Sequence, residues 1–339
     1  MDDAIDDIDR TSVPGLTFRH FRGDPDLPGI LAVIHAAHHR DGVDAFPSLE
    51  RLANELDHPV NENAASDLIV GELDARIVAY ARASWSVRNG TYVYQSDGEV
   101  HPDVRRRGIG RALLRAEHGR LRRMAADQPA DAPRHLQAWL FDGQAGRAAL
   151  LSSEGYAPVR YFTEMARSLA EPIPTVALPD GLEIRPVVPD DHRRIFDAEA
   201  EAFRDHWGYR EWTDADMDRL FADPDLDTSL WRVGWAGDAV AGVVVTLVPQ
   251  TENAELGTLR GWLDRISVRR PWRRRGLAAA LIASAFEGLR ERGLDTAMLG
   301  VDAENPTGAL ALYERLGFRR VSGGQVLTRP LDDPEVSGR

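Results

Sequence analysis

Two stretches of the chain share an arginine-rich turn that leads into an apolar helix. They read VRRPWRRRGLAAALI, from Val268 to Ile282, and VHPDVRRRGIGRALL, from Val100 to Leu114. The residues after the glycine have the period of an amphipathic helix, and the run GWLDRISV, which ends at Val268, alternates between apolar and polar residues as a strand does. Each stretch therefore predicts a strand, a glycine-containing loop and a helix in succession.

Both stretches belong to a longer internal repeat. The outline that starts GLTFRHFRGD at Gly15 returns as GLEIRPVVPD at Gly181, 166 positions later. LLSSEGY at Leu150 returns as LYERLGF at Leu312, 162 positions later. Three matches in the same order and at similar spacing indicate a duplicated unit of roughly 165 residues.

The repeat divides the 339 residues into two domains, as the length also suggests at about 150 residues per domain. We expect a disordered acidic N-terminus over 1–14, an N-terminal domain over 15–166 and a C-terminal domain over 181–339. Residues 167–180, RSLAEPIPTVALPD, carry three prolines and predict a semi-rigid linker.

Each copy predicts strand, helices, three strands, helix, strand, helix and strand. In the first copy DLIVGEL and RIVAYARASW form a hairpin and HLQAWLF is a later strand; the second copy has SLWRVGWAG, DAVAGVVVTLVP, GWLDRISV and TAMLGVD. We therefore expect an α+β fold made of two fused units. Each unit would be a mixed, mostly antiparallel sheet flanked by helices.

Composition excludes several classes of protein. The net charge of −13 argues against binding to nucleic acid or to an anionic membrane. The chain has no cysteine, and its 41 basic residues are all arginine, which excludes a thiolate nucleophile, a Schiff-base lysine and a Walker A loop. No apolar run reaches 18 residues and the N-terminus does not resemble a signal peptide, so we expect a cytoplasmic protein without a membrane partner.

The loops have the forms R-x-x-G-x-A at Arg273 and R-x-x-G-x-G at Arg105. Glycines before a helix let an anion approach consecutive backbone N–H groups, and the helix dipole favours negative charge. A pyrophosphate fits such a loop, although an ordinary helix start with a solvated basic face has the same sequence. A dinucleotide-binding fingerprint is less favoured because Leu113 and Leu281 stand where it needs a small residue.

The motifs, in their order, resemble those of the GNAT N-acetyltransferases, and the resemblance covers essentially the whole chain as two fused units. The first copy has Val100, Arg105, Gly108, Gly110, Gly155 and Tyr156. The second copy has nearly the full pattern: Val268, Arg273, Gly276, Ala278, Asn305, Ala309, Leu312, Tyr313, Gly317 and Phe318.

The resemblance implies that acetyl-CoA is the co-substrate. The strand ending at Val268 would splay from its neighbour and pair with the pantetheine arm, the loop from Arg273 would hold the pyrophosphate, and Asn305 would lie near the pantetheine. The implied cofactor-binding residues are Ile266, Ser267, Val268, Arg273, Arg274, Arg275, Gly276, Leu277, Ala278 and Asn305, with Val100, Arg105, Gly108, Ile109 and Gly110 in the first copy.

The resemblance also implies two catalytic groups. Tyr313 would approach the thioester sulfur, where a phenol is a plausible proton donor to the leaving thiolate. Asp264, on the same strand as Val268, is the candidate base for the attacking amine; Glu255 and Asp302 compete with it. The alternatives are that Tyr313 is a core aromatic and that Asp264 is a strand-edge residue paired with an arginine.

The first copy departs from the family pattern at the proposed acid, where Leu151 occupies the position of Tyr313. We therefore expect one catalytic unit, the second, and one degenerate unit that retains its phosphate loop. Without cysteine, transfer would be direct and not through a thioester on the protein. The histidines at His35, His38 and His39 have helical spacing but lack a matching ligand motif, so we expect surface histidines and no metal.

The predicted function is acetyl-CoA-dependent N-acetylation of a primary amine, on a small molecule or an amino-terminus. The alternatives are a CoA-binding regulatory or scaffold protein without turnover and, with less support, a nucleotide-binding protein. A fused pair favours a monomer that is a pseudo-dimer of two units. The stretches 207–212 and 250–262 would shape the acceptor pocket, and no residue code in them identifies the acceptor.

Overall fold

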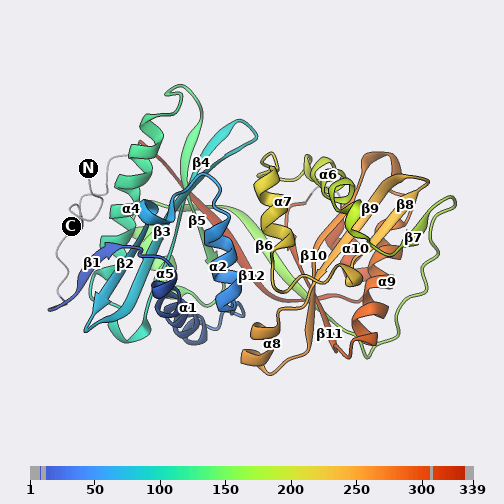
Figure 1. Ribbon diagram of the computed structural model, residues 1–339, viewed down its shortest axis with the longest axis horizontal. Helices are drawn as coiled ribbons and strands as arrows, with labels where there is room; N and C mark the ends of the chain where they lie inside the picture. The colour runs from blue at the N-terminus through green and yellow to red at the C-terminus, as the bar shows by residue number, and fades with distance from the viewer. Residues whose placement is uncertain (1–7, 9–12, 306–307, 333–339) are drawn as a thin grey trace. The chain divides into compact units, whose positions relative to one another are not determined.

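The computed structural model describes residue 8, residues 13–305 and residues 308–332, so most of the expected disordered N-terminus lies outside the described residues. The chain forms two compact units (Figure 1). Unit 1 contains the residues up to Arg160 together with those from Gly324 onward, and unit 2 contains Tyr161–Gly323.

The sheet of unit 1 has the order β1-β2-β3-β4-β5-β12. Neighbouring strands are antiparallel except for β4 and β5, which are parallel. Its strands are β1 (Thr17–His20), β2 (Leu68–Leu73), β3 (Arg76–Arg88), β4 (Thr91–Val100), β5 (Arg134–Phe141) and the second half of β12 (Arg319–Pro330). Its helices are α1 (Leu27–Asp41), α2 (Leu49–Asp57), α3 (Ala64–Asp67), α4 (Ile109–Ala126) and α5 (Ala145–Ser153).

Unit 2 repeats this arrangement with the order β7-β8-β9-β10-β11-β6, and β10 and β11 are its parallel pair. Its strands are β7 (Glu183–Arg185), β8 (Arg232–Ala236), β9 (Ala239–Leu247), β10 (Arg260–Val268), β11 (Thr296–Asp302) and most of β6 (Ala157–Ser168). Its helices are α6 (His192–Phe203), α7 (Asp214–Phe221), α8 (Gln250–Leu256), α9 (Leu277–Glu291) and α10 (Ala309–Arg315).

The expected fold class, two α+β units with mixed sheets, is confirmed, but the compact units do not coincide with the sequence repeats. The last strand of the first repeat, β6, pairs with β11 of unit 2, whereas the last strand of the second repeat, β12, pairs with β5 of unit 1. Each sheet is therefore completed by the final strand of the other repeat. The chain passes from one compact unit to the other at Arg160 and at Gly324, whereas the predicted domains follow the sequence repeats.

The first residues of the expected linker are integral to unit 2. Arg167 is buried and donates to the carbonyls of Leu316 (2.8 Å) and Pro172 (2.8 Å). Leu169 is 1% exposed within the core. Because Arg167 belongs to a paired strand and Leu169 packs in the core, the stretch begins as part of the fold of unit 2.

Helices cover both faces of each sheet. In unit 2 the side chains of β9 alternate between two clusters: Val243 and Val245 pack with Ile195 of α6, and Val244 packs with Leu281 of α9. Burial on both faces explains why β9 is a continuous apolar run in the sequence. In the described part of the chain, no helix combines the length and apolar character needed to cross a membrane.

Candidate active site

The parallel strands β10 and β11 pair only along their first residues. Arg260, Gly261 and Trp262 face Thr296, Ala297 and Met298, and the pairing between the two strands stops there although both continue. On its other side β10 stays paired with β9 to Val268. The described residues beyond Trp262 thus form a splay, in which one edge of β10 is not used by β11. We call this the C-terminal splay, and it contains the expected Ile266, Ser267 and Val268.

A β-bulge interrupts β10 inside the C-terminal splay. Leu263 pairs with Thr246 and Arg265 pairs with the next residue, Val245, so that Asp264 is the extra residue. A bulge leaves the extra residue out of the ladder and bends the strand. Asp264 is consequently exposed between two neighbours that are buried or half-buried.

The loop after β10 has the backbone conformation of an anion-binding turn. Arg274 (φ 60°) and Gly276 (φ 90°) are left-handed, and α9 begins directly after Gly276. Left-handed residues at a helix start direct successive N–H groups toward one point, where the helix dipole adds positive potential. A Cβ built on Gly276 would meet nothing within 4 Å, which shows open space at the turn. The loop therefore suits a pyrophosphate; Leu277 and Ala278 form the first turn of α9.

The side chain of Arg273 turns back into the protein and supports this loop. Its guanidinium donates to the Val268 carbonyl (2.8 Å), the Asp205 carboxylate (2.6 Å) and the Ala202 carbonyl (3.0 Å). Hydrogen bonds from Arg270 and Arg273 hold the pKa of Asp205 below its usual range. Arg273 thus ties the loop to the strand end and to α6.

Tyr313 lies on α10 in the core of unit 2. It is 7% exposed and its ring meets Phe318 edge-on at 6.0 Å. Burial raises the pKa of Tyr313 to about 12, so the phenol keeps its proton at neutral pH. The two readings of this residue are therefore compatible: the ring is a core aromatic, and its hydroxyl is a neutral hydrogen-bond donor.

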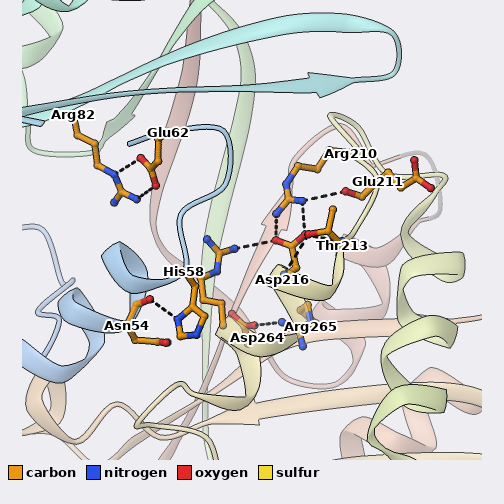
Figure 2. A network of polar contacts seen from close by, with 11 residues as sticks. Asn54, His58, Glu62, Arg82, Arg210, Glu211, Thr213, Asp216, Asp264 and Arg265 are labelled. Carbon is orange, nitrogen blue, oxygen red and sulfur yellow. Dashed lines mark hydrogen bonds and ion pairs between the residues drawn. The ribbon is translucent and has the colours of Figure 1, made fainter. Parts of the chain in front are cut away.

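Asp264 forms an ion pair with Arg265 at 3.5 Å (Figure 2). Arg265 also donates to both carboxylate oxygens of Glu199 on α6, each at 3.3 Å, and Glu199 is fully buried. Burial raises the pKa of Glu199, while the charge of Arg265 opposes that rise. A carboxylate with a raised pKa beside the splayed strand is a feature of proton-transfer sites as well as of buried ion pairs.

The loop between α6 and α7 lies against the splayed strand. The Arg265 guanidinium is 5.5 Å from the ring centre of Trp212, and Trp212 packs on Phe203 at 5.6 Å. Asp216 at the start of α7 holds the loop by accepting from Arg210 (2.7 Å) and from Thr213 N (2.8 Å), as Figure 2 shows.

Two residues of the same loop have different surroundings. Burial lowers the pKa of His206, and its ring packs on Phe203 at 4.4 Å. Trp207 is 40% exposed and meets Phe162 edge-on at 6.2 Å. The loop that the sequence predicts to shape the acceptor pocket therefore contains a histidine with a lowered pKa, His206, and an exposed tryptophan, Trp207.

The other candidates lie at distinct places in unit 2. Asn305 is in the turn after β11, where its N–H donates to the Asp302 carbonyl (3.1 Å). Asp302 ends β11 and accepts from Glu304 N (3.0 Å). Glu255 is exposed on α8. Arg275 reaches the Asp180 carbonyl at 3.4 Å.

Unit 1 has the same loop. Arg106 (φ 65°) and Gly108 (φ 87°) are left-handed before α4, and Arg105 donates to the Val100 carbonyl (2.9 Å) and to Asp41 (2.7 Å). A cavity of about 470 Å³ adjoins the loop. It is lined by Val100, Arg105, Gly108, Ile109 and Gly110, among others.

Unit 1 lacks two features of unit 2. The β3–β4 ladder runs from Arg88–Thr91 to Ala79–Val100 without a bulge. Leu151, at the position of Tyr313, is 2% exposed and offers no hydroxyl. Unit 1 therefore has the left-handed turn without a hydroxyl at the position of Tyr313 and without the bulged strand.

The three histidines of α1 surround one aromatic ring. The rings of His35, His38 and His39 lie 5.3, 6.2 and 4.5 Å from that of Phe46. The Nε2 atom of His35 is also 2.9 Å from the Pro47 carbonyl. These contacts pack the segment that follows α1, and the half-buried His35 and His38 are less exposed than the surface positions we expected.

Two features of the site escaped the sequence analysis. The bulge at Asp264 depends on the register with β9, which no local pattern records. Glu199 lies in the ordinary helical run DAEAEAF, and its burial becomes apparent only when α6 is placed on the sheet.

Known proteins share this sequence and this fold. The sequence pattern of the Acetyltransferase (GNAT) family matches residues 34–126 and 192–318. Mycothiol acetyltransferase from Geodermatophilus obscurus is 32% identical over 305 residues, covering 88% of this chain and 93% of the relative. The mycothiol acetyltransferase from Salinispora arenicola is 33% identical over 317 residues, covering 88% and 91%.

Solved structures agree with this assignment. A GCN5-related N-acetyltransferase from Sphaerobacter thermophilus has a TM-score of 0.70 at 26% identity and covers 96% of this chain and 98% of its own. A tandem GNAT protein from the clavulanic acid biosynthesis pathway shares the fold, with a TM-score of 0.69 at 18% identity over 94% of this chain and all of its own. With the family pattern matching most of the chain and relatives of nearly the same length at 32–33% identity, the chain belongs to the GNAT family of acetyltransferases.

Proposed function

We propose that unit 2 transfers the acetyl group of acetyl-CoA directly to a primary amine of a small molecule. The observation that carries this proposal is the C-terminal splay, which ends in the left-handed turn at Arg274 and Gly276. A strand edge left unpaired by its neighbour, leading to an anion-binding helix start, is what a pantetheine arm with a pyrophosphate requires.

The residues of unit 2 fit acetyl-CoA in three ways. The amides of the turn and the first residues of α9 would hold the pyrophosphate. Along Ile266 to Val268, the edge of β10 that β11 leaves unpaired would pair with the amides of the pantetheine, apart from the Val268 carbonyl, which already accepts from Arg273. Asn305 would lie beside the arm, at the end of the other strand of the splay.

Three groups would then carry the transfer. The amine nitrogen attacks the thioester carbonyl, a C–N bond forms, and the C–S bond breaks. A bulge takes its extra residue out of the regular ladder, and a backbone N–H at the bulge around Asp264 would stabilise the negative charge that develops on the carbonyl oxygen. Tyr313 would hydrogen-bond to the leaving sulfur, and Asp264 would take the proton of the amine directly or through water.

The relatives suggest the acceptor to test first. They are named for acetyl transfer in mycothiol, and they align with this chain over 88% of its length. We propose an acceptor of the mycothiol type for this chain. The exposed Asp264 and the loop that carries Trp207 would contact it, and Glu199 would position Arg265 beneath that loop.

A coupled assay tests this function. The purified chain is incubated with acetyl-CoA and a panel of amines that includes the deacetylated mycothiol precursor, and the release of free thiol is measured. We expect thiol release that depends on the amine and an acetamide product by mass spectrometry. Release of thiol without an acetylated amine, or no release with any amine while acetyl-CoA still binds, would favour the non-catalytic CoA-binding alternative.

A further inference from the structure

An arginine side chain crosses between the parallel strands of unit 1. The strands β4 and β5 pair from Tyr92–Arg134 to Gln95–Gln137, and this pairing then stops while both strands continue. We call the region beyond it the N-terminal splay. Arg147, on α5, donates to the Gly98 carbonyl of β4 (2.6 Å) and to the Trp139 carbonyl of β5 (3.0 Å).

The guanidinium thus bridges the two diverging strands. A third contact, to the Ser96 carbonyl at 3.5 Å, is at the limit of a hydrogen bond and adds little. The planar fork of an arginine can reach acceptors on both strands at once, and a charged donor makes stronger bonds than a neutral amide. The carbonyls of the splay in unit 1 therefore have a partner supplied by the chain itself.

The internal repeat identifies the equivalent positions in unit 2. Gly98 and Ile266 lie two residues before the valines that end β4 and β10, so the carbonyl that Arg147 occupies corresponds to that of Ile266. Aligning Gly155 with Gly317 places Arg147 opposite Ala309. Ala309 has a single methyl group and is half-buried on α10.

We propose that Arg147 is a built-in occupant of the N-terminal splay, which keeps the pantetheine arm of acetyl-CoA out of unit 1, and that Ala309 keeps the splay of unit 2 open. This inference rests on the proposed function, because it assumes that the arm binds along the splayed strand. According to this inference, one side chain at one position of the repeat decides whether a unit binds acetyl-CoA.

The proposal also accounts for a mixture of features in unit 1. The anion loop at Arg106 and Gly108 is present, and the cavity of about 470 Å³ that adjoins it is lined in part by Gly98 and Arg147. The strand edge that would hold the rest of the ligand is already hydrogen-bonded to Arg147. To enter, the arm would have to displace charged donors with its own neutral amides, which form weaker bonds.

Reciprocal substitutions test the proposal by isothermal titration of the full-length chain with acetyl-CoA. We expect one equivalent to bind to the wild type and a second, weaker equivalent to bind to Arg147→Ala. Ala309→Arg should weaken the existing site at least tenfold and lower turnover accordingly. The matched control is Arg115→Ala, which removes an arginine of unit 1 that donates to the Glu154 carboxylate just after α5; this variant should bind one equivalent, like the wild type.

The outcomes separate this inference from the proposed function. A wild-type chain that binds two equivalents, or an Arg147→Ala chain that is folded and still binds one, overturns the inference alone. If Arg147→Ala does not fold, Ala309→Arg decides, because unchanged affinity and turnover in that variant also overturn it. A wild-type chain that binds no acetyl-CoA overturns the proposed function and this inference with it.

Discussion

Replacing Tyr313 with phenylalanine removes one oxygen atom from the proposed chemistry and leaves the ring in place. Tyr313 is 7% exposed and its ring packs edge-on against Phe318, a contact that phenylalanine retains. We therefore expect the variant to fold, with a free energy of unfolding within about 1 kcal/mol of the wild type. The change isolates the hydroxyl.

The expected loss follows from the pKa of the phenol. Burial raises the pKa of Tyr313 to about 12, whereas a thiol has a pKa of about 8.5. The two pKa values differ by roughly 3.5, so complete proton transfer from the phenol to the thiolate would cost about 5 kcal/mol. In the proposed mechanism the hydroxyl would therefore act mainly as a hydrogen-bond donor to a developing charge, which is worth about 1.5–3 kcal/mol. We expect kcat to fall about 10- to 100-fold, at the low end of general-acid effects.

The assay is steady-state thiol release over a range of pH. The KM for acetyl-CoA should change less than about threefold, because the hydroxyl acts on charge that develops in the transition state. Ionisation of Tyr313 should not affect the wild-type rate below about pH 10, since its pKa is about 12. Tyr156→Phe in unit 1, which removes the hydroxyl that lies 2.8 Å from His118 Nε2, is the control for losing a buried phenol and should keep its turnover. Unchanged kcat in Tyr313→Phe would refute the assigned role.

Three further predictions concern the loop and the core. Gly276→Ala puts a Cβ on a residue with φ of 90°, which costs about 1–2 kcal/mol of stability, and it should also raise the dissociation constant for acetyl-CoA. The control is Gly293→Ala, with φ of 80°, which should show the same stability cost in denaturant unfolding and leave the dissociation constant for acetyl-CoA unchanged. Asp205→Asn should raise the KM for acetyl-CoA several-fold with little effect on kcat, because the partner that Arg273 contacts at 2.6 Å loses its charge. A fall in kcat with an unchanged KM would contradict a supporting role. Burial raises the pKa of Glu117, so the folded protein holds a proton that the unfolded chain releases above about pH 4.5. Above that pH, this group lowers the free energy of unfolding by about 1.4 kcal/mol per pH unit until the pKa of the folded state is reached. Glu117→Gln should remove that slope, and an equal pH dependence of unfolding in the variant and the wild type would count against this reasoning.

Much of the fold was predictable from local patterns. The hairpin β2–β3, the strands β5 and β11 and the helix α9 lie where alternation and helical period indicate them. The left-handed turn was also readable, because Gly276 stands just before an apolar helical run and glycine adopts positive φ at little cost. Such signals depend on neighbours within a few positions, so they survive without knowledge of the tertiary fold.

The exchange of β6 and β12 was not predictable from the same patterns. Each of the two strands is the final strand of its own repeat. Each could pair with either β5 or β11, which occupy equivalent positions in the two repeats. Two nearly equivalent edges cannot be distinguished by a strand's own alternation. The choice depends on connections and packing across the whole chain.

The candidate site divides in the same way. Tyr313 and the loop at Gly276 follow from motif and spacing. The bulge at Asp264, the buried pair of Glu199 with Arg265 and the bridge made by Arg147 depend on which residues meet across the sheet. A residue type in a helix does not reveal whether its side chain reaches solvent or a strand carbonyl.

Residue order alone was sufficient to predict the duplication, the element types and the glycine turn before the helix, because periodicity, glycine conformation and helix dipoles are local properties. The folded chain decided which strand closes each sheet and which polar groups meet within each unit. Those outcomes depend on hydrogen-bond partners that are distant in sequence: Arg147 reaches a carbonyl 49 positions away, and Arg265 reaches a carboxylate 66 positions away.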